Sequence, residues 1–399
     1  MSAPRFLQIH FLTSYAGALL NRDDAGLSKR LTYGGAVRTR VSSQCLKRHW
    51  RTSAGGWSLA ATGADLSVRS RSVFEYAIRP KLVEAAPRVA ADILDAAGAA
   101  LSRGLYGKKA DDPKKRQALL LGWREVDFLT EKLTAIVREA ADADAAGKAV
   151  TAMFEGKETK ANLSVMRESA GALAAGLEAA LFGRMITSDP AANTDAAMHV
   201  AHAFTVNEQE SETDYFTVVD DLKLRDDDAD SGSAGIFDTE LTSGVYYGYV
   251  VIDVPLLVAN ITGATPERWA QAAVDRDLPA KVVQHLVHLI ATVSPGAKKG
   301  STAPYAFAST LLVEAGARQP RSLASAFESA IRGGQGASVS SAAETALFGR
   351  LRTIDRAYGF DGSRRFLSLD VGSMDGVGDS VTIDEIALWA GERVRTASI

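Results

Sequence analysis

Basic and turn-forming residues gather near the start of the chain. Residues 1–51 hold nine lysines or arginines and two aspartates, a local charge of +7, while the whole chain of 399 residues has a formal net charge of −3. Closely spaced cations that also donate hydrogen bonds are typical of a protein that holds a phosphate backbone. A solvated charged helix face is the alternative, since most charge runs are no more than that.

A short helix beginning near Ser43 would place the cations of its segment on one side, because positions three and four apart share a helix face. One stripe then holds Gln44, Lys47, Arg48 and Arg51, and the opposite stripe holds Cys45, Leu46, His49 and Trp50, which can pack inward. Ser42 or Ser43 is a good N-cap. A capped helix start offers free N–H groups and partial positive charge to a phosphate.

Upstream of that helix, residues 37–41 alternate in character as a strand does. Apolar or hydroxyl side chains alternate with Arg38 and Arg40, so a strand would aim both arginines at one face. Gly34-Gly35 supplies a turn at which backbone can come close to a ligand. The strand, the hydroxyl cap and the basic helix together predict a cradle for a sugar-phosphate chain.

Length and composition limit the number of structural units and the class of protein that this chain can be. A chain of 399 residues exceeds the usual size of one domain, and a hydrophobic content of 46% is ordinary for a globular protein. No apolar run approaches a membrane-spanning length, and the N-terminus lacks a signal-peptide pattern. The one cysteine, Cys45, cannot form an internal disulfide. We expect two or more structural units, no membrane partner and a cytoplasmic location.

The order of patterns along the chain predicts an α+β fold. The segments with strand character are residues 5–15, 196–206 and 244–254. Between the first two, residues 57–182 are Ala-rich and helical, and Thr265-Pro266 is expected to open a later helix that runs to about Val293. Two strand–helix–strand groups with insertions suggest a split β-α-β, ferredoxin-like sheet.

Residues 207–243 have the opposite charge from the basic segment. They hold twelve acids and two bases, a balance of −10. Large apolar side chains nevertheless interrupt the acids, in the pairs Tyr215-Phe216, Val218-Val219 and Ile236-Phe237. A loop that only needed solubility would not carry them, so we expect these side chains to pack against something.

Catalytic and metal-binding motifs fit the sequence poorly. Residues 296–301 resemble a phosphate loop, but their lysines precede the second glycine, whereas a P-loop needs Gly-Lys-Ser/Thr at a helix start. The pairs His199/His202 and His285/His288 have a spacing that could chelate a metal, although core or surface histidines explain both more simply. We predict no cofactor and no bound metal.

Carboxylates leave one enzymatic alternative open. The adjacent pairs Asp23-Asp24 and Asp220-Asp221 would diverge on an extended chain. A two-metal nuclease instead needs carboxylates that converge on its ions, and these can come from distant positions. A metal-dependent nuclease therefore remains an alternative to a binding protein.

Several blocks of sequence together resemble one known family. Near the N-terminus they are Asn21-Arg22-Asp23-Asp24, Gly34-Gly35 and Arg40-Val-Ser-Ser-Gln-Cys-Leu-Lys-Arg48. Later come Gly183-Arg184-Met185-Ile-Thr-Ser, Ala201-His202-Ala203, Asp214-Tyr-Phe-Thr-Val-Val-Asp-Asp-Leu222, Ser243-Gly244-Val-Tyr-Tyr and Pro295-Gly-Ala-Lys298. The chain resembles the CasC family, the repeated RNA-binding backbone subunit of the type I-E CRISPR Cascade complex. The match runs to about residue 300 and is looser beyond.

The resemblance implies a right-hand-shaped α+β protein. Its palm would be a modified RNA-recognition-motif (ferredoxin-like) sheet, its fingers a large helical insertion and its thumb a long, hairpin-like loop. The implied parts are the first part of the palm (1–56), the fingers (57–195), a palm strand (196–206), the acidic thumb (207–243) and the second part of the palm with C-terminal helices (244–399).

A function and a set of partners are also implied. In this family several copies assemble head to tail along the guide RNA (crRNA), and each thumb folds over the RNA and displaces a base at regular intervals. The bases between stay free to pair with target DNA in antiviral defence. The implied partners are the guide RNA, target DNA, further copies of the chain and other Cascade subunits, and the subunit would not be an enzyme.

Residue roles follow from the resemblance together with the pattern of the basic segment. The predicted RNA contacts are Asn21, Arg22, Lys29, Arg38, Arg40, Ser42, Ser43, Gln44, Lys47, Arg48, Arg51 and Lys298. Apolar wedges against displaced bases would be Met185, Tyr215, Phe216, Val219 and Ile236. Lys157 and Lys160 in the fingers would face target DNA.

Charge adds a prediction about assembly. The acidic and basic segments are complementary, so they could be facing surfaces of successive subunits in an open, head-to-tail contact. Acids that merely keep the thumb soluble are the alternative. For the whole molecule, the alternatives are a metal-dependent RNA nuclease of the related type III backbone family, which cuts target RNA with a thumb-side aspartate, and a small-molecule enzyme that uses the sheet.

Overall fold

An antiparallel sheet forms the centre of the molecule. The computed structural model describes residues 3–155, 172–186, 190–219, 233–334 and 336–398. Strands lie side by side in the order β11-β10-β1-β9-β7-β3-β2. Their bounds are β1 Phe6–Ala18, β2 Arg30–Tyr33, β3 Ala36–Val41, β7 Ala203–Thr205, β9 Ser233–Asp253, β10 Thr310–Gly316 and β11 Ser363–Ser368. Outside this path, β6 (Met198–Val200) and β8 (Glu210–Val219) also pair with β9.

Four of these strands and two helices have the ferredoxin-like arrangement. Along the chain they follow the order β1, α1 (Ser43–Arg51), β7, β9, α9 (Asp277–Thr292) and β10. In space the order is β10-β1-β9-β7, so the first strand lies between the last and the third. Each neighbouring pair is antiparallel. The predicted ferredoxin-like, α+β palm is therefore confirmed.

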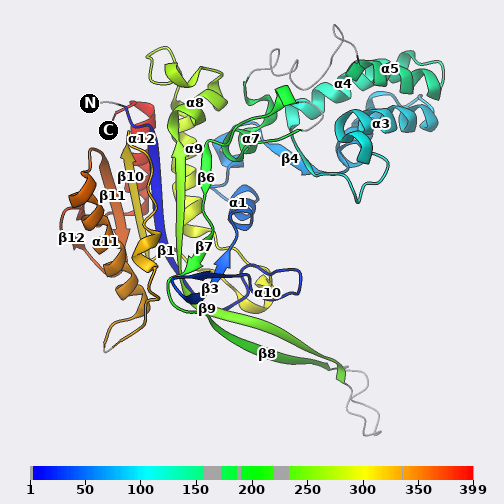
Figure 1. Cartoon of the computed structure of the whole chain (residues 1–399). Coiled ribbons are helices and arrows are strands. Elements are labelled where there is room, and N and C mark those ends of the chain that lie inside the picture. The colour runs from blue at the N-terminus through cyan, green and yellow to red at the C-terminus, as the bar shows by residue number, and fades with distance from the viewer. Residues whose placement is uncertain (1–2, 156–171, 187–189, 220–232, 335, 399) are drawn as a thin grey trace.

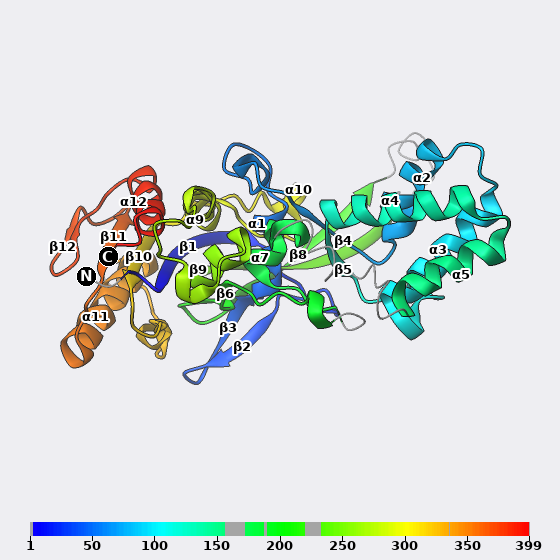
Figure 2. The same ribbon diagram turned by 90° about the horizontal axis from the view of Figure 1, so that it is seen from above.

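Helices cover both faces of this sheet, as Figures 1 and 2 show. The covering elements are α8 (Val254–Thr262), α9 and α12 (Ile383–Arg395) on one face, and η8 (Ala324–Phe327) and α11 (Val339–Tyr358) on the other. Ile9 and Val250 point into the first core, where α1 also packs, and Leu12 and Tyr247 point into the second. Because both faces are covered, a ligand surface of the palm has to lie at an edge or an end of the sheet.

The predicted helical insertion has a core of its own. Its helices are α2 (Arg79–Ala85), α3 (Ala91–Tyr106), α4 (Trp123–Glu139) and α5 (Ala143–Glu155). Leu101, Leu129 and Leu133 are fully buried among them. The small sheet of β4 (Ser67–Ser70) with β5 (Leu119–Gly122), and helix α7 (Leu177–Phe182), connect this unit to the palm. Figures 1 and 2 place the fingers on the side of the molecule away from both termini.

The acidic segment forms an antiparallel hairpin. Strand β8 pairs with the first half of β9 from Glu210 opposite Ser243 to Val219 opposite Ser233. Beyond the hairpin, β9 continues through the sheet to Asp253 and pairs with β1. Figure 1 shows the hairpin leaving the palm at the end opposite the termini. The thumb is thus an extension of a central strand, which fixes its direction at the root.

Short elements complete the part of the chain that the structure describes. They are α10 (Lys299–Thr302), β12 (Ser373–Met374), β13 (Gly378–Asp379), a π turn η2 (Phe74–Ile78) and the 3-10 turns η1 (Ala60–Thr62), η3 (Gly107–Lys109), η4 (Ala172–Ala175), η5 (Pro190–Ala192) and η7 (Pro266–Arg268). The predicted helix from Thr265 was wrong at its start, because Thr265 makes no side-chain cap bond and α9 begins only at Asp277. No helix in the described ranges is long and apolar enough to cross a bilayer.

Candidate nucleic-acid interface

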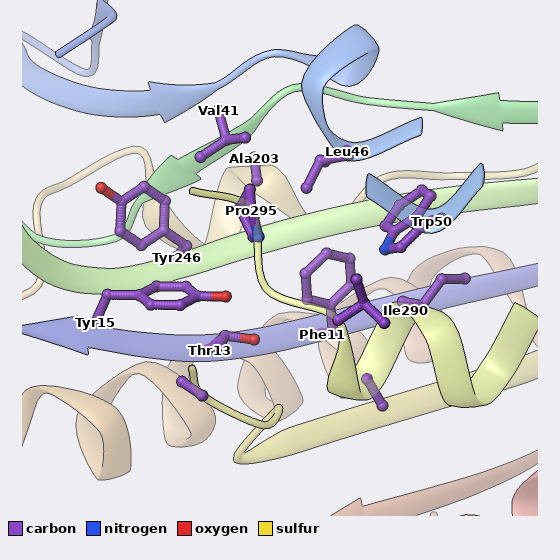
Figure 3. A pocket seen from close by; sticks show the side chains of 13 residues that line it. Phe11, Thr13, Tyr15, Val41, Leu46, Trp50, Ala203, Tyr246, Ile290 and Pro295 are labelled. Atoms are coloured by element: carbon purple, nitrogen blue, oxygen red, sulfur yellow. The ribbon is translucent and has the colours of Figure 1, made fainter. Parts of the chain in front are cut away.

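Helix α1 is seated on the sheet in the predicted orientation. The hydroxyl of Ser42 accepts a hydrogen bond from the Cys45 N–H at 3.3 Å and caps the helix. Leu46 and Trp50 are buried, and Figure 3 shows both lining a small cavity above β1 and β9. This cavity measures ≈ 20 Å³, little more than the space of one water, so the helix is held closely against the core. The predicted inward stripe is confirmed for Leu46 and Trp50, while Cys45 and His49 are half-buried.

Basic side chains on the outer side of α1 meet an arginine from the finger root. Lys47 and Arg51 are half-buried and Arg48 is exposed, as is Arg69 on β4. Burial and the charge of Arg69 lower the pKa of Lys47. Burial lowers the pKa of Arg51 as well. The negative charge of Glu178 raises this pKa, whereas the positive charges of Arg69 and Arg48 lower it further. Like charges are thus crowded here, which is the setting that a bound anion relieves.

Arg69 is a candidate contact that the sequence analysis missed. It lies 18 positions after Arg51, beyond the basic segment, and β4 carries it back to α1. The alternation of Ser67 to Arg71 was a signal for a strand that points Arg69 and Arg71 to one side. Nothing local in the sequence, however, indicates that this strand approaches α1.

A second basic group surrounds the N-terminus of α1. The Ser43 N–H donates to Nδ1 of His202 at 3.3 Å, and Nη1 of Arg40 lies 3.3 Å from the same atom. Arg40 Nε donates to the Arg30 carbonyl at 3.0 Å. Burial and the charges of Arg40 and Lys29 lower the pKa of His202, which favours the neutral ring that accepts from Ser43. His202 therefore occupies the helix start, where a phosphate oxygen would accept the same hydrogen bond.

The loop before α10 extends this surface toward the thumb. The Gly296 N–H donates to Nε2 of His49 at 3.3 Å, so the loop lies against α1. Burial raises the pKa of the Cys45 thiol. The nearby charges of Lys29, Arg48 and Lys299 act in the opposite direction and lower it, but by less, so all three cations lie near this thiol. We name as the basic edge the cations Lys29, Arg40, Lys47, Arg48, Arg51, Arg69 and Lys299. Among the described residues, none of these seven forms a salt bridge with a carboxylate.

Arg38 is not part of this surface, so its prediction as an RNA contact was wrong. The side chain is fully buried. Its Nη1 donates to the carbonyls of Thr205 at 3.0 Å and Val206 at 2.6 Å, and its Nη2 donates to that of Phe327 at 3.1 Å. Arg38 and Arg40 do alternate in β3 as expected, but the segment around Phe327 covers the first of them. Arg38 therefore connects β3 to the end of β7, where it contacts Thr205 and Val206, and to η8.

The Gly34-Gly35 turn serves packing as well. It joins β2 to β3 as a two-residue hairpin loop in which both φ angles are positive, 59° and 78°. A Cβ atom on Gly34 would lie 1.5 Å from the Glu328 carbonyl oxygen. The close backbone approach expected at this turn is therefore an approach of the chain to itself.

The remaining predicted contacts of this segment fall into two groups. Asn21 and Ser42 support the helix start, because Asn21 Oδ1 accepts from the Ser42 N–H at 2.9 Å and the Ser42 hydroxyl is already used in the cap. Arg22 and Gln44 are exposed, and the Ser43 hydroxyl donates to Gln44 Oε1 at 3.3 Å. Their contact with RNA stays a prediction.

Lys298 contacts the thumb. Its Nζ donates to the Thr239 hydroxyl and lies 5.1 Å from the centre of the Phe216 ring. Phe216 stacks on Phe237 of the opposite strand with ring centres 5.6 Å apart. Both rings are more than one third exposed, so they offer an apolar surface beside a cation. Phe237 was not among the predicted wedges, although its place next to Ile236 in an acidic segment was a signal for it.

Met185 is displayed on a braced loop at the junction of fingers and palm. Its side chain is 63% exposed. Next to it, the buried guanidinium of Arg184 pairs with Glu125 of α4 at 2.5 Å, and the Ile186 N–H donates to Asn193 Oδ1 at 2.6 Å. An exposed apolar side chain on backbone that is held on both sides suits a base wedge, and the wedge role of Met185 stays a prediction.

Other predicted contacts lie partly outside the described residues. Tyr215 is 72% exposed on β8. Val219 and Ile236 lie in the hairpin strands, but their side chains are outside the description, as are Lys157 and Lys160 altogether. The roles assigned to them stay predictions.

One thumb acid faces inward. The Glu240 carboxylate accepts from the Ser28 N–H at 2.7 Å and pairs with the Arg30 guanidinium, and its side chain is 8% exposed. It therefore joins the thumb root to the start of β2 and is not available to a neighbouring molecule. The acids exposed on the described part of the hairpin are Glu210, Glu212, Asp214 and Asp238, and Glu210 accepts a hydrogen bond from Asn207 Nδ2 at 3.3 Å.

Metal-ligating side chains do not gather in threes anywhere in the ranges that the structure describes. His285 and His288 are buried on α9. The first ring is hydrogen-bonded to the Ser58 carbonyl at 2.9 Å, and the second stacks on Trp57 at 3.6 Å and lies 3.4 Å from an Asp384 oxygen. These histidines have the core role that the sequence favoured for them.

Comparison with known proteins gives a family and a fold. The family model of CT1975-like protein (Cas_CT1975) matches residues 7–388. A chain of the solved structure "CRISPR RNA-guided surveillance complex, pre-nicking" is 25% identical, with a TM-score of 0.74 over 97% of this chain and 100% of that one. A chain of a second structure, "CRISPR RNA-guided surveillance complex", is 22% identical, with a TM-score of 0.64 over 96% and 99% of the two chains. No curated protein sequence matches. Since the family model covers nearly the whole chain, the protein belongs to the CT1975-like Cas family.

Proposed function

We propose that this chain is a CasC-type backbone subunit of a type I-E CRISPR Cascade complex. Several copies line up head to tail along the guide RNA, and each holds phosphates while the bases remain available to target DNA. The subunit is non-catalytic and acts in the cytoplasm, next to other Cascade subunits, in antiviral defence. The two solved relatives come from RNA-guided surveillance complexes, which supports this role.

The basic edge is the observation that carries the proposal. Its cations extend from the finger root at Arg69, across α1, to Lys299 near the thumb root, and Figure 1 shows α1 between the roots of fingers and thumb. They form no salt bridge among the described residues, and burial together with neighbouring cations lowers the pKa of Lys47 and Arg51. A row of phosphates would neutralise them without reading any base, which is what a subunit that accepts every guide sequence needs.

A double substitution tests the phosphate contact. Lys47→Ala with Arg48→Ala removes two cations of the basic edge and keeps the buried Leu46 and Trp50. We expect weaker binding to unrelated single-stranded RNAs by the same factor, and a log–log salt slope that is smaller by up to about 1.4, or about 0.7 per phosphate contact.

The matched control is Arg79→Ala with Lys81→Ala. These finger cations are half-buried, as Lys47 is, but they already pair with Asp95 and Asp127. The control should bind RNA as the unchanged protein does. A loss confined to one RNA sequence, or equal losses in the control, would contradict phosphate binding by the basic edge.

Catalysis is tested separately. Incubation of the assembled protein with guide RNA, complementary RNA and Mg²⁺ should leave both strands intact. Cuts at a regular spacing would instead support the nuclease alternative of the type III backbone family and refute the non-catalytic role.

A further inference from the structure

Two large aromatic side chains stand exposed on the loop that follows α10. Tyr305 is 73% exposed and Phe307 is 71% exposed. Single exposed apolar side chains are common on protein surfaces. Two aromatic rings on one short loop form a larger apolar surface. The backbone of this loop is hydrogen-bonded to the palm, so its conformation keeps both rings exposed.

The backbone between the two rings is fixed to the palm. Pro304 is buried, and the Ala306 N–H and carbonyl both bond to the Ser294 hydroxyl at 2.9 Å. Ala306 also lines the cavity beneath α1, and the Ala308 N–H donates to the Ala291 carbonyl at 2.8 Å. The loop is thus anchored on both sides of each ring, with the small alanines inward and the rings outward.

The Tyr305 ring adjoins the basic edge, and Phe307 follows two positions later in the same loop. The Lys299 Nζ lies 6.0 Å from the centre of the Tyr305 ring, and the charge of Lys299 reaches Cys45 on α1. From 294 to 309 the chain holds two lysines and no acid, so nothing on this loop repels a polyanion. Proteins that bind single strands combine such a positive track with aromatic rings, because every base has a face that can stack.

We propose that Tyr305 and Phe307 form a stacking platform for nucleobases of the RNA whose phosphates lie on the basic edge. This inference rests on the proposed RNA-binding function and adds a base contact that ignores sequence. Stacking engages the face of a base and leaves its pairing edge free, so the platform is compatible with presentation of the guide to a target strand.

The test uses the full chain and a single-stranded RNA. Tyr305→Ala and Phe307→Ala should each weaken RNA binding by about 5- to 150-fold if one base stacks on each ring. Tyr305→Phe and Phe307→Tyr keep the rings and should bind normally. Tyr358→Ala removes a ring of similar exposure from α11, which packs on the other face of the sheet, and should also bind normally. Ultraviolet cross-linking of the unchanged complex should attach a nucleotide to Tyr305 or Phe307, as mass spectrometry would show.

The outcomes separate this inference from the function on which it rests. If the alanine variants bind RNA normally while Lys47→Ala with Arg48→Ala does not, the platform is refuted and the function stands. If neither set affects binding, both fall. If the alanine variants bind RNA as single chains but no longer assemble into multimers, the rings contact a neighbouring protein and the platform is refuted.

Discussion

Arg38 and Arg48 lie ten positions apart in one basic segment, yet burial gives them different tasks. The Arg38 guanidinium is enclosed and donates to backbone carbonyls, so it cannot reach a phosphate. Arg48 is exposed on the outer side of α1, where an anion can approach it. A cation therefore belongs to the binding surface only when the fold leaves its donors free.

Arg38→Met should destabilise the protein without a specific effect on RNA contacts. The substitution leaves buried carbonyls without donors, at a cost of about 1–3 kcal/mol for each group that stays unsatisfied. We expect urea denaturation to show a free energy of unfolding lower by at least about 2 kcal/mol. Arg48→Met, the exposed control, should change it by less than about 0.5 kcal/mol. Unchanged stability with weakened RNA binding in Arg38→Met would return Arg38 to the interface.

Single residues show where sequence reasoning reaches its limit. The inward and outward sides of α1 followed from spacing alone, because helix geometry fixes them locally. The burial of Arg38 depends on carbonyls 167 and 289 positions away, and the approach of Arg69 to α1 depends on the folding of the fingers. No local pattern contains that information.

At the scale of elements, the thumb is held by its root. Strand β9 passes from the hairpin into the middle of the sheet, so the direction of the thumb follows from pairing with β1. Glu240 on one side and Lys298 on the other join the hairpin to the palm. The acids of residues 207–243 suggested a loop, whereas the alternation of β8 was hidden because polar residues occupy both of its faces.

A substitution that weakens the contacts at the thumb root should change the motion of the hairpin base. Glu240→Gln removes the charge that pairs with Arg30 and weakens the acceptor for the Ser28 N–H. We expect faster hydrogen exchange in residues 28–31 and in the root of the hairpin, with little change in the fingers. Asp95→Asn, which breaks an exposed pair with Arg79, is the matched control and should leave exchange at the thumb root unchanged. Equal exchange in all three proteins would show that Glu240 does not anchor the thumb.

For the whole molecule, opposite charges are separated in space. The basic edge lies along α1 between the roots of fingers and thumb, and the exposed thumb acids lie on a hairpin that projects beyond the palm (Figure 1). A surface on a projecting arm cannot meet its complement on the same molecule without bending back. The proposed head-to-tail contact between copies would satisfy both surfaces and would leave one of each at the ends of a filament.

Neutralised thumb acids should therefore impair assembly. Glu212→Gln, Asp214→Asn and Asp238→Asn keep the shapes of the exposed side chains and remove their charges. We expect fewer copies per guide RNA by mass photometry, while a single chain still binds a short RNA. Intact filaments with these substitutions would mean that the acids only keep the thumb soluble.

The order of strands and helices was easier to predict than the way in which helices cover the second face of the sheet. The ferredoxin-like order of strands and helices follows from patterns in the sequence, and the resemblance to a known family supplied the division into palm, fingers and thumb. That α11 and η8 cover the second sheet face was not predicted, because their apolar residues find partners only once the sheet exists. This covering is why we place the proposed nucleic-acid surface at an edge of the sheet.

Chemical footprinting of one bound guide RNA distinguishes contacts to the RNA backbone from contacts to the bases. Hydroxyl radicals probe the riboses, and dimethyl sulfate probes the pairing edges of the bases. The proposed function predicts protected riboses along the guide and reactive pairing edges at most positions, with the ribose protection reduced by Lys47→Ala with Arg48→Ala. Protected pairing edges together with accessible riboses would show that the protein holds bases and not the backbone, and would contradict it.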